Sequence, residues 1–388
     1  MTAVTVAAHP SRRPARPRVT AVLVLLAVVL AGCADVTESG DDRPPPRAGV
    51  VRAAGGAPLA GVPGLERLAT QLRRRDAARL RHGDVRTAIR PALQRTLVDA
   101  LRDGPGTGVV VGVRDGRLLA AAGRHGRDPW RSRLAPGAAL YPVLTAGALS
   151  GGKVTATTRL DGNGDRSPGD VRNLDGERLG PIPLEAALAH ASRTAFADVA
   201  VRLSAWTVDE LLRRVGFDTR ARAGDLSGLV ARSRGAGLTP TGAHGVGPVP
   251  GFVDARGRYL DAGDRARTTT LQLAQLALTL ASDGRRTDVG VTRPGPLPVQ
   301  ERWEPAVGRQ VRRMLAATVR AGAVPGLRGS GAAVAGTSGP SPTGGSVVVA
   351  FAPAGRPRVA IALTGDEDAA TLGARARHVL ERAIAPRR

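Results

Sequence analysis

A hairpin signal near residue 115, together with three extended segments near the C-terminus, constrains the fold of this chain more than any other feature. Val109–Val113 and Leu118–Ala122 are apolar, and they flank Asp115-Gly116, a dipeptide that favours a tight turn between antiparallel strands. Further extended segments joined by Gly- and Pro-rich turns are expected at Ala332–Ala335, Val347–Phe351 and Val359–Leu363. These segments predict an antiparallel five-stranded sheet.

Apolar residues at helical spacing fill most of the sequence between the second and third of these strands. The helices expected there are Leu140–Leu149, Leu184–Ala191, Ala195–Leu203, Val208–Val215 with Thr207 as its cap, Leu271–Ala281 and Glu304–Val319. An extended piece at Asp84–Ile89 and a helical stripe from Leu93 to Leu101 precede the hairpin, and Ala369–Ile384 predicts a closing helix. The order predicts an α/β fold, in which helices flank both faces of the sheet and a mostly helical insert separates strands 2 and 3.

The N-terminus has the pattern of an export signal. Four arginines between residues 12 and 18 precede the uncharged apolar run Val19–Ala31, which is shorter than the roughly 20 residues that span a bilayer as a helix. The run ends at Leu30-Ala31-Gly32-Cys33, which resembles a bacterial lipobox and contains the only cysteine of the chain. We therefore expect residues 1–32 to be a lipoprotein signal peptide and Cys33 to anchor the protein to the outer face of the cytoplasmic membrane. An ordinary secretory signal beside a lone cysteine is the alternative.

Composition divides the remaining chain into three parts. Residues 33–63 are rich in Gly, Pro and Ala, which favours a flexible tether. Residues 64–83 form a short segment before the main domain. Residues 84–388 are long enough for one large core.

The chain is strongly basic, with a formal charge of +23 that falls to +19 when the four arginines of the signal peptide are removed. This excess would suit anionic partners such as phospholipid headgroups or wall polymers, but it is almost all arginine, and we expect most of it to be solvated surface. Export and an aromatic content of 2% argue against nucleic acid. A single cysteine excludes an internal disulfide and a cysteine-clustered zinc site, and the scattered histidines lack metal-ligand spacing, so neither metal nor cofactor is expected.

A series of short motifs resembles, in order, the transpeptidase domain of class B penicillin-binding proteins. The motifs are Gly64-Leu65-Glu66, Thr87-Ala88-Ile89 with Leu93-Gln94, the hairpin at Asp115-Gly116, Pro136–Tyr141, Ala191–Phe196, Thr270–Ala274, Ala281–Gly284, Val334–Gly339 and Val349–Pro353. The resemblance implies a β-lactamase/transpeptidase-like fold, and a place in peptidoglycan synthesis outside the cytoplasm.

The same resemblance implies that the reactive side chains are missing. In the family, a serine at the start of a helix attacks a D-Ala-D-Ala peptide or a β-lactam, and a lysine three residues later accepts its proton. Here Ala138 and Tyr141 stand at these positions, Ala191 and Arg193 at the serine and asparagine of the second motif, and Thr337 at the lysine of the third. Alanine offers no nucleophile, and a phenol with a pKa near 10 is a poor base. The reaction uses two lysines, whereas Lys153 is the only one in the chain, so no shift of register restores both.

Three hypotheses follow. The leading one is a catalytically inactive domain that binds peptidoglycan stem peptide or a wall-synthesis protein. Its backbone near Gly336, Thr337, Ser338 and Gly339 would pair with an extended peptide. Arg193 would either supply a cation to the cleft or lie on the surface as an ordinary charge. The second is an active D,D-transpeptidase or carboxypeptidase that uses Ser150 and Lys153, a literal S-x-x-K, although Gly151 and Gly152 read better as a helix end. The third is a purely structural scaffold lipoprotein.

Overall fold

The main sheet has five strands, all antiparallel, in the order β4-β3-β11-β10-β9. Its strands are β3 (Gly106–Gly112), β4 (Leu118–Arg124), β9 (Ala335–Pro340), β10 (Ser346–Ala352) and β11 (Val359–Gly365). The computed structural model describes residues 49–165, 171–203, 205–215, 268–292, 299–329, 331–341 and 344–386. The predicted α/β class and five-stranded sheet are thus confirmed, whereas the expected signal peptide and Cys33 lie outside the described residues.

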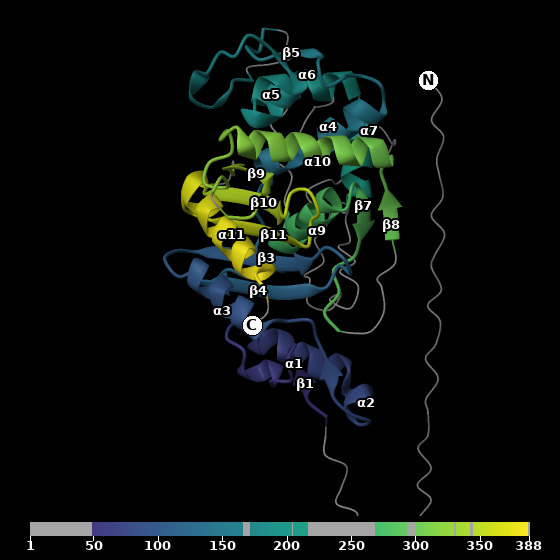
Figure 1. The fold of residues 1–388 in the computed structure, drawn as a ribbon, viewed down its shortest axis with the longest axis vertical. Helices are drawn as coiled ribbons and strands as arrows, with labels where there is room; N and C mark the ends of the chain where they lie inside the picture. The colour runs from purple at the N-terminus through teal and green to yellow at the C-terminus, as the bar shows by residue number, and fades with distance from the viewer. Residues whose placement is uncertain are drawn as a thin grey trace, which may run out of the picture. The chain divides into compact units, whose positions relative to one another are not determined.

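Helices cover both faces of this sheet, which is why its central strands β10 and β11 have nearly continuous apolar sequences. Successive residues of one strand face opposite sides, so Val109 belongs to one core and Val110 to the other. On one side pack α3 (Pro91–Ala100) and α11 (Ala369–Ile384), which runs across the front of the strands in Figure 1. On the other side lies α9 (Thr270–Ala281), every residue of which is buried.

The predicted strand Ala332–Ala335 is wrong in its bounds, because β9 begins where that segment ends. Gly336 and Gly339 lower the intrinsic preference of residues 335–340 for a strand. Pairing of Thr337 with Val349 and of Gly339 with Val347 on β10 imposes the extended conformation instead. The location of β9 therefore comes from its neighbour rather than from its own side chains.

The insert is mostly helical, as expected. It contains η2 (Gly137–Leu140), α4 (Tyr141–Ser150), α5 (Leu184–Ala189), α6 (Arg193–Leu203) and α7 (Ala205–Arg214), with α9 and α10 (Pro305–Arg320) following. Two small antiparallel pairs, β5 (Arg159–Asp161) with β6 (Pro181–Pro183) and β7 (Arg285–Thr287) with β8 (Val299–Arg302), and the turn η3 (Leu174–Gly176) complete it. The prediction that Thr207 caps a helix is wrong, since α7 starts at Ala205, a strong helix former.

The predicted tether ends earlier than residue 63. Val51, Leu59 and Val62 are 1%, 0% and 4% exposed, and β1 (Val51–Arg52) pairs in parallel with β2 (Val85–Arg86). Between β1 and β2 lie η1 (Leu59–Gly61), α1 (Glu66–Arg75) and α2 (Ala77–Leu80). The correction has a simple cause: isolated apolar anchors among Gly and Pro lack the periodicity by which a sequence signals a helix or strand. Within the described ranges, no helix is both long and apolar enough to traverse a bilayer.

Candidate functional site

Ala138, at the expected nucleophile position, lies in a 3₁₀ turn that leads into α4. Gly137 has a φ of 52°, and the α-helix proper starts at Tyr141 with Pro142 in its first turn, where the missing N–H of a proline costs no hydrogen bond. The turn packs against β9. A Cβ placed on Gly339 would be 3.4 Å from the Cβ of Ala138. The position therefore stands beside the sheet edge, but it presents a methyl group.

Tyr141, at the expected position of the first lysine, is part of the core. It is 3% exposed, and its ring stacks on that of Phe196 with centroids 4.1 Å apart and planes 6° from parallel. Phe196 is fully buried on α6. The Thr145 hydroxyl donates to the Tyr141 carbonyl one turn earlier, at 2.9 Å. An aromatic stack between α4 and α6 thus occupies the place where the resemblance led us to look for an amine.

Ala191 and Arg193, at the second motif, flank the junction between α5 and α6. Ala191 adopts a φ of 48°, in the left-handed region that side chains with a Cβ rarely enter, and Arg193 is the first residue of α6. Both are half-buried. The junction is therefore a tight, conformationally specified turn, with alanine and arginine at the two positions that the resemblance assigns to a serine and an asparagine.

A buried polar network next to this junction was missed by the sequence reasoning. The Asn173 carbonyl oxygen accepts from the Ser192 hydroxyl at 3.0 Å, and from the backbone N–H and hydroxyl of Thr194, both at 3.2 Å. The Asn173 amide donates to the carbonyls of Gly162 at 2.8 Å and Glu177 at 2.9 Å. These bonds fasten the segment around β5 and β6 to the start of α6. Ser192 and Thr194 at a helix start were the available signal, but Asn173 lies in an irregular segment.

Strand β5 is also tied to the middle of α6. Asp198 accepts from the backbone N–H of Asp161 at 3.2 Å and from two nitrogens of Arg202 at 2.9 and 3.0 Å. The hydrogen bonds that Arg202 donates to the Asp198 carboxylate raise the pKa of the guanidinium above its usual value, so Arg202 stays charged. The ion pair between Asp198 and Arg202 thus has a structural role, which is to hold β5 against α6.

On β9, alternation places Thr337 and Ser338 on opposite faces. Thr337 shares its face with Gly339 and therefore lies on the side of Ala138, whereas the Ser338 hydroxyl donates to the Pro325 carbonyl at 3.4 Å on the other side. Their exposures are 5% and 8%. Gly336 is required where it stands, since a Cβ there would lie 2.4 Å from the Val349 carbonyl oxygen. Ala138, Thr337 and Gly339 are thus brought together, while the Ser338 side chain is directed away from them.

Ser150 and Lys153 lie at the other end of α4. Ser150 is the last residue of the helix, Gly151 is its C-cap and Gly152 has a φ of 63°, so the glycine pair ends the helix as predicted. Both Ser150 and Lys153 are exposed. With a rise of about 1.5 Å per residue, the helix separates Ser150 from Tyr141 by about 14 Å. In the described part of the chain, no group of three or more His, Cys, Asp or Glu side chains could hold a metal ion.

Comparison with known proteins agrees with this geometry. A family model described as the penicillin binding protein transpeptidase domain matches residues 106–385. The chain is 27% identical to the peptidoglycan D,D-transpeptidase PbpA of Mycolicibacterium smegmatis, over 76% of this chain and 70% of that protein.

Two solved structures share the fold. The D,D-transpeptidase domain of a peptidoglycan glycosyltransferase from Eggerthella lenta superposes with a TM-score of 0.69 at 21% identity, covering 87% of this chain and 98% of that one. PBPA from Mycobacterium tuberculosis gives 0.68 at 20% identity, covering 87% and 99%. Because the family match spans most of the chain, this protein belongs to the penicillin-binding-protein transpeptidase domain family, whose members act in peptidoglycan synthesis outside the cytoplasm.

Proposed function

We propose that this protein is a catalytically inactive penicillin-binding protein that is held at the outer face of the cytoplasmic membrane by a lipid on Cys33. It binds a peptidoglycan stem peptide, or a protein of the wall-synthesis machinery, without forming an acyl-enzyme. The scaffold of the family is retained, and the reactive positions are replaced.

The observation that carries the proposal is the environment of Ala138. Acyl transfer requires a hydroxyl beside β9 and an amine one helical turn away that accepts its proton. At these two places the protein has a methyl group next to Gly339 and a phenol ring packed on Phe196. PBPA of M. tuberculosis, by contrast, has been crystallised as a penicillin G acyl-enzyme. Because this protein shares the fold but has different side chains at these two places, we expect it not to form the acyl-enzyme that PBPA forms with penicillin G.

Features that do not depend on side-chain identity support binding without turnover. β9 is the last strand of the sheet, so its outer backbone is the natural place for an extended peptide to add a strand. Gly336 and Gly339 keep that backbone close to β10 and to Ala138. Thr337 offers a neutral hydrogen-bonding group where the family has a charged lysine. We therefore expect weaker recognition of a terminal carboxylate than in the active members of the family.

A fluorescent penicillin tests the proposal directly. The purified full chain is incubated with the label beside M. tuberculosis PBPA as a positive control, and intact mass is measured before and after. No covalent adduct is expected on this chain. An adduct on any serine would overturn inactivity, and its loss in Ser150→Ala would favour the second hypothesis, an active enzyme based on Ser150 and Lys153.

Calorimetry with a stem peptide that ends in D-Ala-D-Ala separates binding from a purely structural role. Heat of binding that disappears in Gly339→Val, where the new side chain would crowd Ala138, supports peptide recognition at β9. Salt-sensitive capture of a wall-synthesis protein with no heat from the peptide would instead favour the scaffold.

A further inference from the structure

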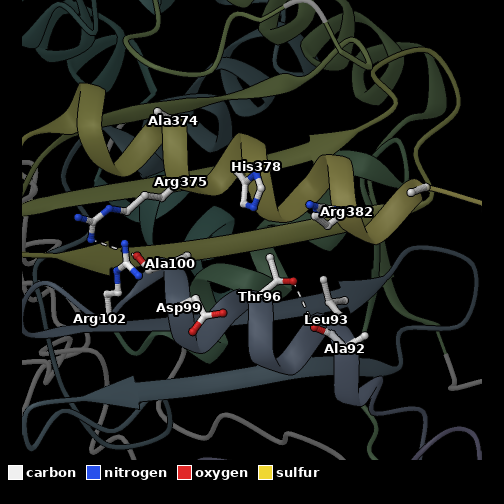
Figure 2. A pocket seen from close by; sticks show the side chains of 11 residues that line it. Ala92, Leu93, Thr96, Asp99, Ala100, Arg102, Ala374, Arg375, His378 and Arg382 are labelled. Carbon is white, nitrogen blue, oxygen red and sulfur yellow. Dashed lines mark hydrogen bonds between the residues drawn. The ribbon is translucent and has the colours of Figure 1, made fainter.

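Among the surface cavities lined by described residues, two differ in how their charges are paired. The larger, about 820 Å³, lies between α3 and α11 (Figure 2). One of the cations that line it, Arg375, is bonded to Glu367 at 2.5 Å, to Asp103 at 2.9 Å and to the Ala100 carbonyl at 3.1 Å. The exposed carboxylate of Asp99 lines the same groove. This groove is therefore close to electrostatic balance, and it indicates no ligand charge.

The second cavity, about 460 Å³, is lined by four arginines from separate elements. Arg114 lies at the turn between β3 and β4, Arg285 is on β7, Arg302 is on β8 and Arg309 is near the start of α10. Among the described residues, none of the four makes a side-chain ion pair or hydrogen bond. This is the feature that sets the pocket apart in an arginine-rich chain.

The acidic residue that lines the pocket is already neutralised. Asp283 forms an ion pair with Arg312, with 2.7 Å between the carboxylate and Nε. Arg312 also donates to the Gly355 carbonyl at 2.7 Å, which fixes it beside the turn between β10 and β11. Four arginines therefore line the cavity, and the carboxylate that lines it with them is already paired with Arg312. Such convergence of like charges costs free energy in the empty protein, and an anion relieves it.

The wall that carries Asp283 is rigid. Asp283 has a φ of 53° and Gly284 a φ of 82°, and a Cβ on Gly284 would lie 2.5 Å from the Cβ of Trp303. On the neighbouring helix, a Cβ on Gly308 would lie 2.0 Å from the Asp283 carbonyl oxygen, so the turn and α10 are in direct backbone contact. Pro305, in the first turn of α10, also lines the pocket, and the partial positive charge of a helix N-terminus adds to that of the arginines.

We propose that this pocket is a binding site for a phosphate-bearing ligand. Guanidinium groups present two parallel N–H donors that match the oxygens of a phosphate, and several of them around one cavity suit a group with more than one negative charge. The volume admits a diphosphate or a phospholipid headgroup. None of the lining residues belongs to the set around Ala138, so the site is independent of the transpeptidase-like cleft and of the proposed loss of activity.

Calorimetry on the full chain tests the site with two probes that separate free phosphate from lipid. Pyrophosphate represents the free anion, and dioctanoyl phosphatidylglycerol below its micelle concentration represents a headgroup. The test variant Arg114→Ala/Arg309→Ala removes two exposed arginines of the pocket. Its matched control, Arg74→Ala/Arg95→Ala, removes two exposed arginines on α1 and α3 that have no described ion pair and gives the same net charge. Thermal unfolding checks that both variants fold.

We expect at least one probe to bind the unaltered protein, and the pocket variant to bind it about tenfold or more weakly while the control binds as before. Arg114→Lys/Arg309→Lys should recover only part of the affinity, because an ammonium lacks the paired donors. If the pocket variant loses binding of pyrophosphate, the ligand is a free phosphate. If it loses binding of the phosphatidylglycerol alone, the ligand is a lipid headgroup. Equal weakening in the pocket variant and the control, or no binding of either probe, would overturn the proposal.

Discussion

Replacing Tyr141 by lysine introduces an amine at the position that the resemblance aligns with a lysine of the family, and it tests whether this position belongs to the core. The ring is 3% exposed and stacked on Phe196 at 4.1 Å. Loss of the stack costs about 0.5–1.5 kcal/mol. A buried ammonium without a partner has its pKa lowered by about three units, and each unit corresponds to 1.36 kcal/mol. We therefore expect Tyr141→Lys to lower the free energy of unfolding by about 5 kcal/mol at pH 7.

The pH dependence gives a sharper readout. Between the lowered pKa of the folded state and the usual lysine value near 10.4, the unfolded chain binds more protons than the folded one. The free energy of unfolding of the variant therefore rises with pH relative to that of the unaltered protein, so the difference in stability between the two proteins becomes smaller at higher pH. Urea denaturation at about pH 7 and about pH 9.5 measures this, with Tyr141→Phe as a control that keeps the ring and loses at most about 1 kcal/mol. A lysine variant as stable as the unaltered protein at both pH values would mean that the amine reaches an open cleft, and would refute the reasoning.

Two further predictions concern stability. Gln94 is fully buried and forms hydrogen bonds with the Pro63 carbonyl at 3.0 Å and with the carbonyl and N–H of Ala121 at 2.8 and 2.9 Å. Gln94→Ala should therefore lower the free energy of unfolding, measured by chemical denaturation, by about 3 kcal/mol. A loss below about 1 kcal/mol would contradict the role of Gln94 in holding these segments together. Hydrogen bonds from Thr371, first from its backbone N–H, and from the Ala370 N–H lower the pKa of Asp368 below 3.8, so the stability that this N-cap contributes is present above pH 3.8 and is lost as the pH falls through the lowered value. In Asp368→Ala, the melting temperature should therefore fall less steeply below pH 3.8 than in the unaltered protein. An equally steep fall in the variant would argue against this role of Asp368.

The sheet could be predicted because its signals are local. Asp115-Gly116 specifies a turn by its own conformational preferences, and the apolar runs of β10 and β11 need no partner to be recognised. The bounds of β9 and the docking of residues 49–63 could not be read in this way. Gly336 is extended because β10 lies beside it, and Val51 is buried because β2, far along the chain, pairs with β1.

The candidate site, too, could be predicted from the sequence only where its signals are local. The identities of Ala138, Tyr141 and Thr337 are visible in the sequence, and so is the absence of a second lysine. The stacking of Tyr141 on Phe196 depends on how α4 crosses α6, which no local pattern encodes. The arginine-lined pocket is more remote still, because Arg114 and Arg309 become neighbours only after the whole insert has folded.

The pairing of β3 with β11 bears on how this protein reaches its native state. Along the chain β3 is the first strand of the main sheet and β11 is the last, yet the two strands pair with each other over their full length. Joining ends so distant carries a large loop-closure entropy, and folds dominated by such long-range contacts form slowly. After β3 and β4 have formed their hairpin, the other edge of β3 keeps unpaired N–H and C=O groups until β11 is available to pair with it. A polypeptide cut short before Val359 would thus lack the partner of β3, and such fragments should be targets for proteases or aggregation rather than partly working proteins.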